Sequence, residues 1–121
     1  MNHLKGSLTA IAILCIALSH ACNYGVGNRV RGDNLLHTIV VTKRSTQGPA
    51  NLEATVDYKP NPLLNQQITF ARSWTESSTS CTFTYNDQQQ FGKHFTATFG
   101  SVIPLTELIV TFEVYGINWG I

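Results

Sequence analysis

The strongest structural signal in the chain is the segment Leu52-Glu53-Ala54-Thr55-Val56-Asp57-Tyr58-Lys59. Apolar and polar side chains alternate along it, and successive side chains of a β-strand point to opposite faces of the sheet. An alternation of this kind is typical of a strand with one face in a hydrophobic core and the other in water. The segment therefore predicts a half-buried β-strand.

The same period of two recurs along the chain. It predicts strands at residues 81–85 and 95–99, and a third over residues 68–74, where Ile68 and Phe70 begin an inward face that Arg72 and Trp74 continue toward an edge. These segments are rich in Thr, Val, Ile, Phe and Tyr, which suit a pleated, packed surface.

Two further segments, residues 35–41 and 108–114, are more continuously apolar and are typical of central strands. Residues that favour turns separate all these segments, and no stretch after the N-terminal run has a helical apolar face. We therefore expect an all-β fold, a small antiparallel β-sandwich or barrel of about six strands.

The first residues have the order of a secretory signal peptide. Lys5 provides a positive charge, residues 8–18 form an uncharged apolar run, and Ser19-His20-Ala21 supplies small residues for cleavage. The run is too short for a membrane span, which needs about 20 residues. We expect residues 1–21 to be a signal peptide cleaved after Ala21, with cleavage after Ser19 as the alternative and lipidation of Cys22 as a minor one. Residues 22–121 then form a single β domain outside the cell.

Cleavage would leave two cysteines, Cys22 and Cys81, because Cys15 lies in the signal peptide. In an oxidising compartment the simplest use of such a pair is a disulfide. The alternative is a frayed Cys22 beside a buried Cys81 thiol. The bridge is the favoured interpretation.

The charge of the chain excludes some classes of partner. Loss of Lys5 leaves seven basic and seven acidic residues, with no basic cluster beyond Lys43-Arg44. Nucleic-acid binding normally requires a basic footprint that releases counterions. We therefore expect no direct nucleic-acid binding and no membrane span, and the charge suggests neither a strongly anionic membrane nor a polyanion as a partner.

No arrangement typical of an enzyme or a metal site is found. His37 and His94 are the histidines after the signal peptide, and neither lies in a motif that pairs it with a nucleophile and a carboxylate. The cysteines and histidines lack zinc-site spacing, and the acidic residues are scattered. We expect no catalytic residue, no metal and no cofactor.

Candidate binding residues lie near the two ends of the β domain: Arg29, Arg31 and Asp33 in one loop, and Trp119 near the C-terminus. Arg31-Gly32-Asp33 spells the integrin-binding tripeptide, although Gly and Asp are also what a turn before a strand selects. A set of aromatic residues could line an apolar pocket or, more commonly, fill the core. Its members are Phe70, Trp74, Phe83, Tyr85, Phe95, Phe99 and Phe112.

The segment Gly27-Asn28-Arg29-Val30-Arg31-Gly32-Asp33-Asn34-Leu35 resembles the opening Gly-x-Arg-x-x-Gly-Asp-x-Leu pattern of the insect multiprotein bridging factor 2 family. Gln67-Ile68-Thr69, Phe99-Gly100-Ser101 and Phe112-Glu113-Val114-Tyr115-Gly116 also resemble family segments. The chain departs from the family at two turns, at Gly92-Lys93 and at residues 102–105. The resemblance implies a transcription activator that bridges proteins without binding DNA, although many family members look like secreted, often salivary, insect proteins.

Three hypotheses follow for function. The first is a secreted, non-enzymatic β domain that acts as an extracellular protein- or ligand-binding module, with an unknown protein or a small apolar molecule as partner. The second is the transcriptional coactivator that the family resemblance implies. The third is a carrier of an apolar small molecule.

Overall fold

The computed structural model describes residues 22–77 and 79–119, so the signal peptide expected over residues 1–21 lies outside the described residues. The described residues form seven strands, and all paired strands are antiparallel. A short 3-10 turn, Pro62–Leu64, precedes the fourth strand. The strands are β1 (Asn23–Gly27), β2 (Asn34–Arg44), β3 (Glu53–Tyr58), β4 (Gln66–Thr75), β5 (Cys81–Tyr85), β6 (Phe95–Ser101) and β7 (Glu107–Asn118).

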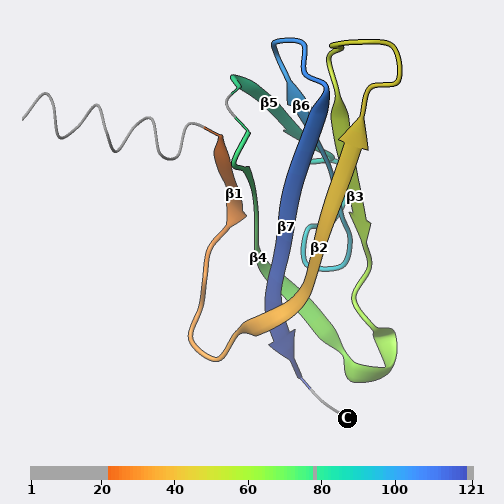
Figure 1. Ribbon diagram of the computed structural model, residues 1–121. Coiled ribbons are helices and arrows are strands. Elements are labelled where there is room, and N and C mark those ends of the chain that lie inside the picture. Colours follow the sequence, from red (N-terminus) through yellow and green to blue (C-terminus); the bar gives the residue numbers. More distant parts are fainter. Residues whose placement is uncertain (1–21, 78, 120–121) are drawn as a thin grey trace, which may run out of the picture.

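The strands form two sheets that pack as a β-sandwich (Figure 1). One sheet has four strands in the order β1-β4-β7-β2, and the other has three in the order β3-β6-β5. The chain changes sheet after β2, β3, β4 and β6, so the two sheets are built from interleaved segments. The all-β sandwich expected from the sequence is confirmed.

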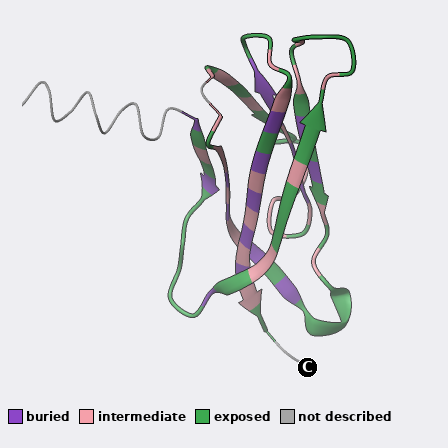
Figure 2. Ribbon diagram, viewed as in Figure 1, coloured by how far each residue is buried: buried purple, intermediate pink, exposed green. Residues whose placement is uncertain are grey.

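The core lies between the two sheets. Strand β7 buries every second residue, Leu108, Val110, Phe112 and Val114, and Phe99 of β6 lies in the facing layer. Figure 2 shows this alternation as buried and partly buried bands along β7, while most of the edge strand β2 is exposed. Burial of apolar surface is the main favourable term in folding, so this layer holds the sandwich together.

Six strands correspond to the segments predicted from the sequence, and β1 is the strand that was not predicted. Its sequence, Asn-Tyr-Gly-Val-Gly, has two glycines, which are depleted in strands. β1 nevertheless pairs with β4 over its whole length. Tyr24 and Val26, which alternate with the two glycines, face the core and give β1 its inward side.

The expected inward face of β4 was wrong beyond Ile68. The register of β4 on β7 shifts between Ile68 and Phe70, which is a β-bulge at Thr69. A bulge adds one residue to one strand and so moves the following side chains to the other face. Ile68, Ala71 and Ser73 are buried, whereas Phe70, Arg72 and Trp74 lie on the outer face of the sheet. The sequence pattern had predicted an inward face for these last three residues.

A disulfide between Cys22 and Cys81 confirms the favoured cysteine pairing. The two residues are 59 positions apart, with 5.9 Å between their Cα atoms. Cys22 precedes β1 and Cys81 begins β5, which are edge strands of the two different sheets. The bond therefore joins the sheets along one side of the sandwich, next to the stacked rings of Tyr24 and Phe83.

The loops collect at two ends of the sandwich (Figure 1). The loops after β2, β4 and β6 lie at one end, and those after β1, β3 and β5 lie toward the other, where β7 also finishes. No helix within residues 22–77 and 79–119 is long and apolar enough to cross a membrane.

Candidate functional site

The outer face of the four-stranded sheet carries arginine, aromatic and acidic side chains that contact one another. They come from the loop after β1, from β4 and from β7. We call this set the arginine–aromatic face, and its members are Arg29, Phe70, Arg72, Trp74, Glu113 and Tyr115.

Glu113 connects the two strands of this face. Its Oε1 atom accepts a hydrogen bond from Arg72 Nε at 2.8 Å and one from the Tyr115 hydroxyl at 3.0 Å. The side chain of Glu113 is 16% exposed and that of Arg72 is 41% exposed. Ion pairs that are partly covered are screened less by salt than fully exposed pairs. Glu113 therefore fixes the orientation of both Arg72 and Tyr115.

Both arginines of the face lie against aromatic rings. The guanidinium carbon of Arg72 is 4.7 Å from the Trp74 ring centre, and that of Arg29 is 4.0 Å from the Tyr115 ring centre. Phe70 extends the set, with its ring centre 5.9 Å from that of Tyr115. Cation–π contacts at these distances are attractive. The face is thus largely ordered before a partner arrives, which lowers the entropy cost of binding.

Two glycines in β1 make room for this face. A Cβ atom on Gly25 would lie 3.1 Å from the Phe70 ring, and a Cβ on Gly27 would collide with the carbonyl oxygen of Thr69. Gly27 also has a φ of +82°, a conformation that side chains disfavour. The glycines allow β1 to approach the bulge in β4, and the bulge places Phe70, Arg72 and Trp74 outward.

Asp33 supports the face from behind. Its carboxylate forms an ion pair with Arg29 at 2.8 Å and accepts hydrogen bonds from the Val30 amide and the Thr69 hydroxyl. The Arg29 guanidinium, helped by these two donors, holds the pKa of the Asp33 carboxyl at about 2, below its ordinary value. The Asp33 side chain is only 2% exposed, against 51% for Arg29. Asp33 therefore positions Arg29 over Tyr115.

The integrin-type tripeptide lies in the turn before β2. Arg31 is exposed, Gly32 has a φ of +93°, and the Asp33 carboxylate is covered by the contacts described above. Integrin-type recognition requires an accessible carboxylate, whereas a turn requires the positive φ and the bonded Asp. Of the three binding residues expected in this loop, Arg29 belongs to the arginine–aromatic face and Asp33 lies beneath it.

Trp119 lies apart from this face, at the end of the sandwich where β7 finishes. Its ring is accessible, because the residue is 61% exposed. The indole Nε1 donates a hydrogen bond to Gln67 Oε1 at 3.0 Å, and the backbone amide donates to the Asn65 carbonyl. Trp119, chosen from the sequence as a binding candidate, therefore presents an exposed ring that does not belong to the arginine–aromatic face.

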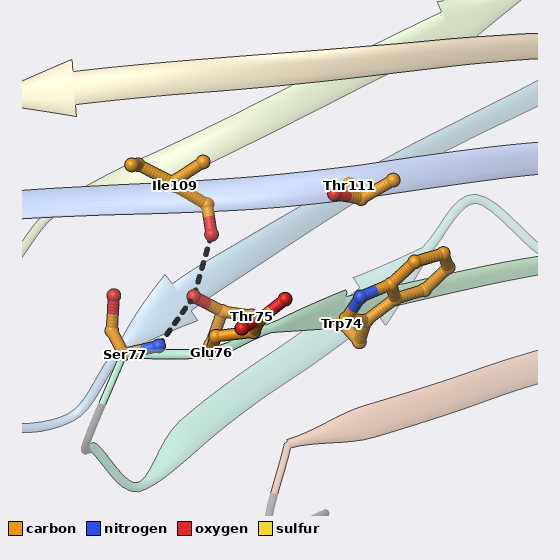
Figure 3. Close-up of a pocket in the computed structure, with 6 residues that line it drawn as sticks. All are labelled: Trp74, Thr75, Glu76, Ser77, Ile109 and Thr111. Atoms are coloured by element: carbon orange, nitrogen blue, oxygen red, sulfur yellow. Dashed lines mark hydrogen bonds between the residues drawn. The ribbon is translucent and has the colours of Figure 1, made fainter.

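A pocket of about 410 Å³ adjoins the arginine–aromatic face at its Trp74 end. Figure 3 shows the Trp74 ring beside Thr111 of β7, with Ile109 farther along the same strand, opposite Thr75. The Thr75 hydroxyl donates to the Ile109 carbonyl at 2.5 Å and accepts from the Ser77 amide at 3.2 Å. The rim combines an apolar wall with the Glu76 carboxylate, which suits one protruding side chain of a protein partner. The lining residues are Trp74, Thr75, Glu76, Ser77, Ile109 and Thr111.

The outer face of the three-stranded sheet is different. It presents five threonines from three adjacent strands, and we call it the threonine face. The hydroxyl oxygens of Thr55 and Thr98 lie 3.4 Å apart. Threonine is favoured on solvated strand surfaces, which accounts for this face without a ligand. Its threonines are Thr55, Thr82, Thr84, Thr96 and Thr98.

The two histidines have structural partners. His37 stacks on Tyr58, with ring centres 5.0 Å apart. The Nε2 atom of His94 lies 2.5 Å from the Asp57 carboxylate and 3.4 Å from the Thr96 hydroxyl, while Nδ1 lies 3.0 Å from the Gln89 amide. A catalytic triad places the acid and the nucleophile on opposite nitrogens of the imidazole. Here both oxygens lie at the same nitrogen, so this geometry differs from a triad.

The described residues also bear on metal binding. Within residues 22–77 and 79–119, no group of three or more His, Cys, Asp or Glu side chains is placed to hold a metal ion.

Sequence reasoning missed five members of the arginine–aromatic face as binding candidates and found only Arg29. Phe70 and Trp74 were interpreted as core or pocket aromatics, because an unbroken alternation from Ile68 would put them inside. A bulge leaves no clear mark in one sequence. The available signal was Glu113, a charged residue within the apolar run of residues 108–114.

Comparison with known proteins identifies no relative of this chain. No protein-family model, no curated protein and no solved structure matches it.

Proposed function

We propose that this protein is a secreted, non-enzymatic binding module that engages a protein partner through the arginine–aromatic face. The observation that carries the proposal is a preordered set of Arg, Trp, Tyr and Phe side chains on a solvent-facing sheet surface. Tyr, Trp and Arg dominate the energetics of protein interfaces, and such residues are usually buried or scattered on surfaces without a partner. The pocket beside Trp74 supplies a recess for an anchor residue of the partner.

Secretion is supported by two independent features. The N-terminal sequence has the charge, apolar run and small residues of a signal peptide. The Cys22–Cys81 disulfide is a bond of oxidising compartments and is rare in the nucleus and cytosol. The same bond speaks against the coactivator hypothesis, which requires a nuclear protein.

Membership of the multiprotein bridging factor 2 family remains part of the proposal. The residues that carry the resemblance have a structural use in this chain: Gly27 makes room for the bulge, Arg29 and Asp33 form an ion pair, and Gly32 makes the turn. A shared motif of this kind supports a shared fold more than a shared partner. Bridging two proteins would itself be a protein-binding function.

Capture of the partner tests the proposal. The protein, with its disulfide intact, is immobilised and exposed to the extracellular fluid of its source, and the retained proteins are identified by mass spectrometry. The affinity of the purified partner is then measured for Trp74→Ala and Arg72→Ala. Each substitution is expected to weaken binding by about 2 kcal/mol, or roughly thirtyfold, as at interface hot spots.

Matched substitutions on the same molecule provide the controls. Arg44→Ala removes an arginine that also pairs with a glutamate of β7 but contacts no aromatic ring in the described residues. Thr84→Ala and Thr98→Ala alter the threonine face. All three are expected to bind within about twofold of the unaltered protein, since exposed residues outside an interface contribute little. Full binding by Trp74→Ala together with loss in Thr98→Ala would overturn the assignment of the face.

A further inference from the structure

The basic and acidic residues of positions 22–121 are equal in number but unevenly distributed in space. The loops after β2, β4 and β6, with the adjoining strand ends, hold two basic and three acidic residues. The loops after β1, β3 and β5, with the adjoining strand ends, hold four basic and three acidic residues. The latter end, which we call the basic end, therefore has one net positive charge, against one net negative charge at the other end. Its charged residues are Arg29, Arg31, Lys59 and Lys93 with Asp33, Asp57 and Asp87.

Apolar side chains project from the same end. Leu63 lies on the 3-10 turn before β4 and is 82% exposed, and Leu64 beside it is 40% exposed. Trp119 is 61% exposed and its backbone bonds to Asn65, the residue after this turn. We call these three residues the apolar tip. A leucine exposed to this degree loses favourable burial energy unless something covers it.

Two lysines flank the apolar tip. A pocket of about 440 Å³ lies between the β3–β4 turn and the loop after β5, and both Lys59 and Lys93 line it, together with Pro62 and Asn65. Among residues 22–77 and 79–119, neither lysine forms an ion pair, whereas Arg29 is paired with Asp33. Asp57, two residues before Lys59, is hydrogen-bonded to His94. Lys59 interacts with the Asp57 carboxylate only at longer range, so both lysine ammonium groups are available to an external anion.

We propose that the basic end docks on an anionic phospholipid surface. Leucine and tryptophan partition into the boundary between headgroups and acyl chains, and tryptophan is enriched there because its ring is amphipathic. Lysines beside them attract anionic headgroups, and the opposite sign of charge at the other end orients the molecule for approach. One projecting turn flanked by unpaired lysines fits a deformable anionic layer. Arg29 lies at this end, but Trp74 and its pocket lie toward the opposite end, so this docking would leave the Trp74 end of the arginine–aromatic face free.

Co-sedimentation with vesicles tests the proposal. The disulfide-bonded protein is mixed with vesicles of phosphatidylcholine alone or of phosphatidylcholine with phosphatidylserine. We expect binding to the mixed vesicles at least tenfold stronger than to phosphatidylcholine, weakening as salt is added because the charge component is screened. Inorganic phosphate at the concentration of the headgroups is expected not to compete, because it offers no layer for the apolar tip.

Substitutions separate the two components. Leu63→Ser with Leu64→Ser is expected to reduce binding at least tenfold, and Val102→Ser with Ile103→Ser is the matched control, since these residues are 48% and 45% exposed at the opposite end. Lys59→Gln with Lys93→Gln is expected to abolish the preference for phosphatidylserine, whereas Lys43→Gln with Arg44→Gln keeps it. All are exposed sites, so folding is checked by thermal unfolding.

Tryptophan fluorescence provides an independent readout. Trp74→Phe leaves Trp119 as the one tryptophan, and its emission is expected to shift to shorter wavelength on mixed vesicles as the ring leaves water. Trp119→Phe should show no shift, because Trp74 lies on the sheet face. Equal binding to both vesicle types, no binding to either, or full binding by the Leu63→Ser, Leu64→Ser variant would overturn the proposal. Concentration-dependent self-association lost in that variant, without vesicle binding, would assign the tip to a second copy of the chain.

Discussion

The two outer faces of the sandwich expose different kinds of side chain to solvent. Both are made of alternate strand residues that point to water, but the threonine face presents short side chains and the arginine–aromatic face presents large ones. A strand surface needs only small, β-branched polar residues to be stable and soluble. The large, mutually bonded side chains of the second face exceed that need. This difference is the reason why we propose the four-stranded sheet, and not the three-stranded sheet, as the binding surface.

The backbone beneath the two faces differs as well. The three-stranded sheet is in regular register from Glu53 to Tyr58 and from Cys81 to Tyr85. The four-stranded sheet has register shifts in both β2 and β4. Bulges re-aim side chains and are frequent beside functional sites. The outward orientation of Phe70, Arg72 and Trp74 therefore depends on the bulge in β4.

The largest expected effect concerns what both faces share. Replacing Cys22 and Cys81 by serine removes the bond between β1 and β5 and should lower the free energy of unfolding by about 4 kcal/mol, since the closed loop is long. Chemical denaturation of the purified protein measures the change. Because β1 places Gly25 against the Phe70 ring and Gly27 against the Thr69 carbonyl, partner binding should fall before the sandwich unfolds. A loss below about 1 kcal/mol would mean that packing alone holds β1 in place.

Two glycines with positive φ compare the stability cost of a substitution beside the β4 bulge with that of one in the turn before β2. Gly27→Ala combines a positive φ with a collision against the Thr69 carbonyl and should cost about 3 kcal/mol. Gly32→Ala meets no atom within 4 Å and should cost only about 1 kcal/mol for its positive φ. Thermal unfolding of the two variants gives the comparison. Equal losses would show that the close approach of β1 to β4 contributes nothing.

The two arginine–glutamate pairs of the four-stranded sheet should differ in coupling energy, because one is partly covered and the other is exposed. A double-mutant cycle on Arg72 and Glu113 should give a coupling of about 1 kcal/mol, because Glu113 is largely covered. Arg44 and Glu107 are 74% and 41% exposed and should give about 0.3 kcal/mol or less. Denaturation of the single and double alanine variants supplies both values. A larger coupling for the exposed pair would contradict the preordering of Arg72 by Glu113.

The free energy of unfolding at acid pH should depend more on Asp33, beneath the arginine–aromatic face, than on Asp57, beside the threonine face. The pKa of Asp33 is lowered from 3.8 to about 2, chiefly by Arg29, so its contribution is complete above about pH 4 and is lost as the pH falls toward 2. Asp33→Asn should flatten the profile in that window. The pKa of Asp57, on the threonine-face side, is lowered mainly by His94, but its side chain is 64% exposed. Asp57→Asn should therefore change the profile less, as unfolding at stepped pH would reveal.

The sequence was sufficient for what depends on repetition. Period-two alternation located β3, β4, β5 and β6, and the continuous apolar runs located β2 and β7, although β2 is an edge strand and not the central strand expected. The compartment suggested by the N-terminus led to the Cys22–Cys81 pair. The sequence was insufficient where one extra residue in a strand reverses the alternation of inward and outward side chains. The bulge at Thr69 turned Phe70, Arg72 and Trp74 outward. The glycines of β1 are typical of a loop, and only the structure shows Gly25 against the Phe70 ring and Gly27 against the Thr69 carbonyl. Asp33 was predicted as a binding residue because it lies in a turn, where side chains are usually exposed, but its side chain is covered by Arg29.

Hydroxyl-radical footprinting of the protein with its captured partner tests the central claim most directly. Oxidation of each aromatic residue is measured by mass spectrometry with and without the partner. If the partner binds the arginine–aromatic face, Trp74 and Tyr115 should become protected while Tyr85, which is 44% exposed on the other sheet, should not change. Protection of Tyr85 with Trp74 still reactive would contradict the assignment and move the binding surface to the three-stranded sheet.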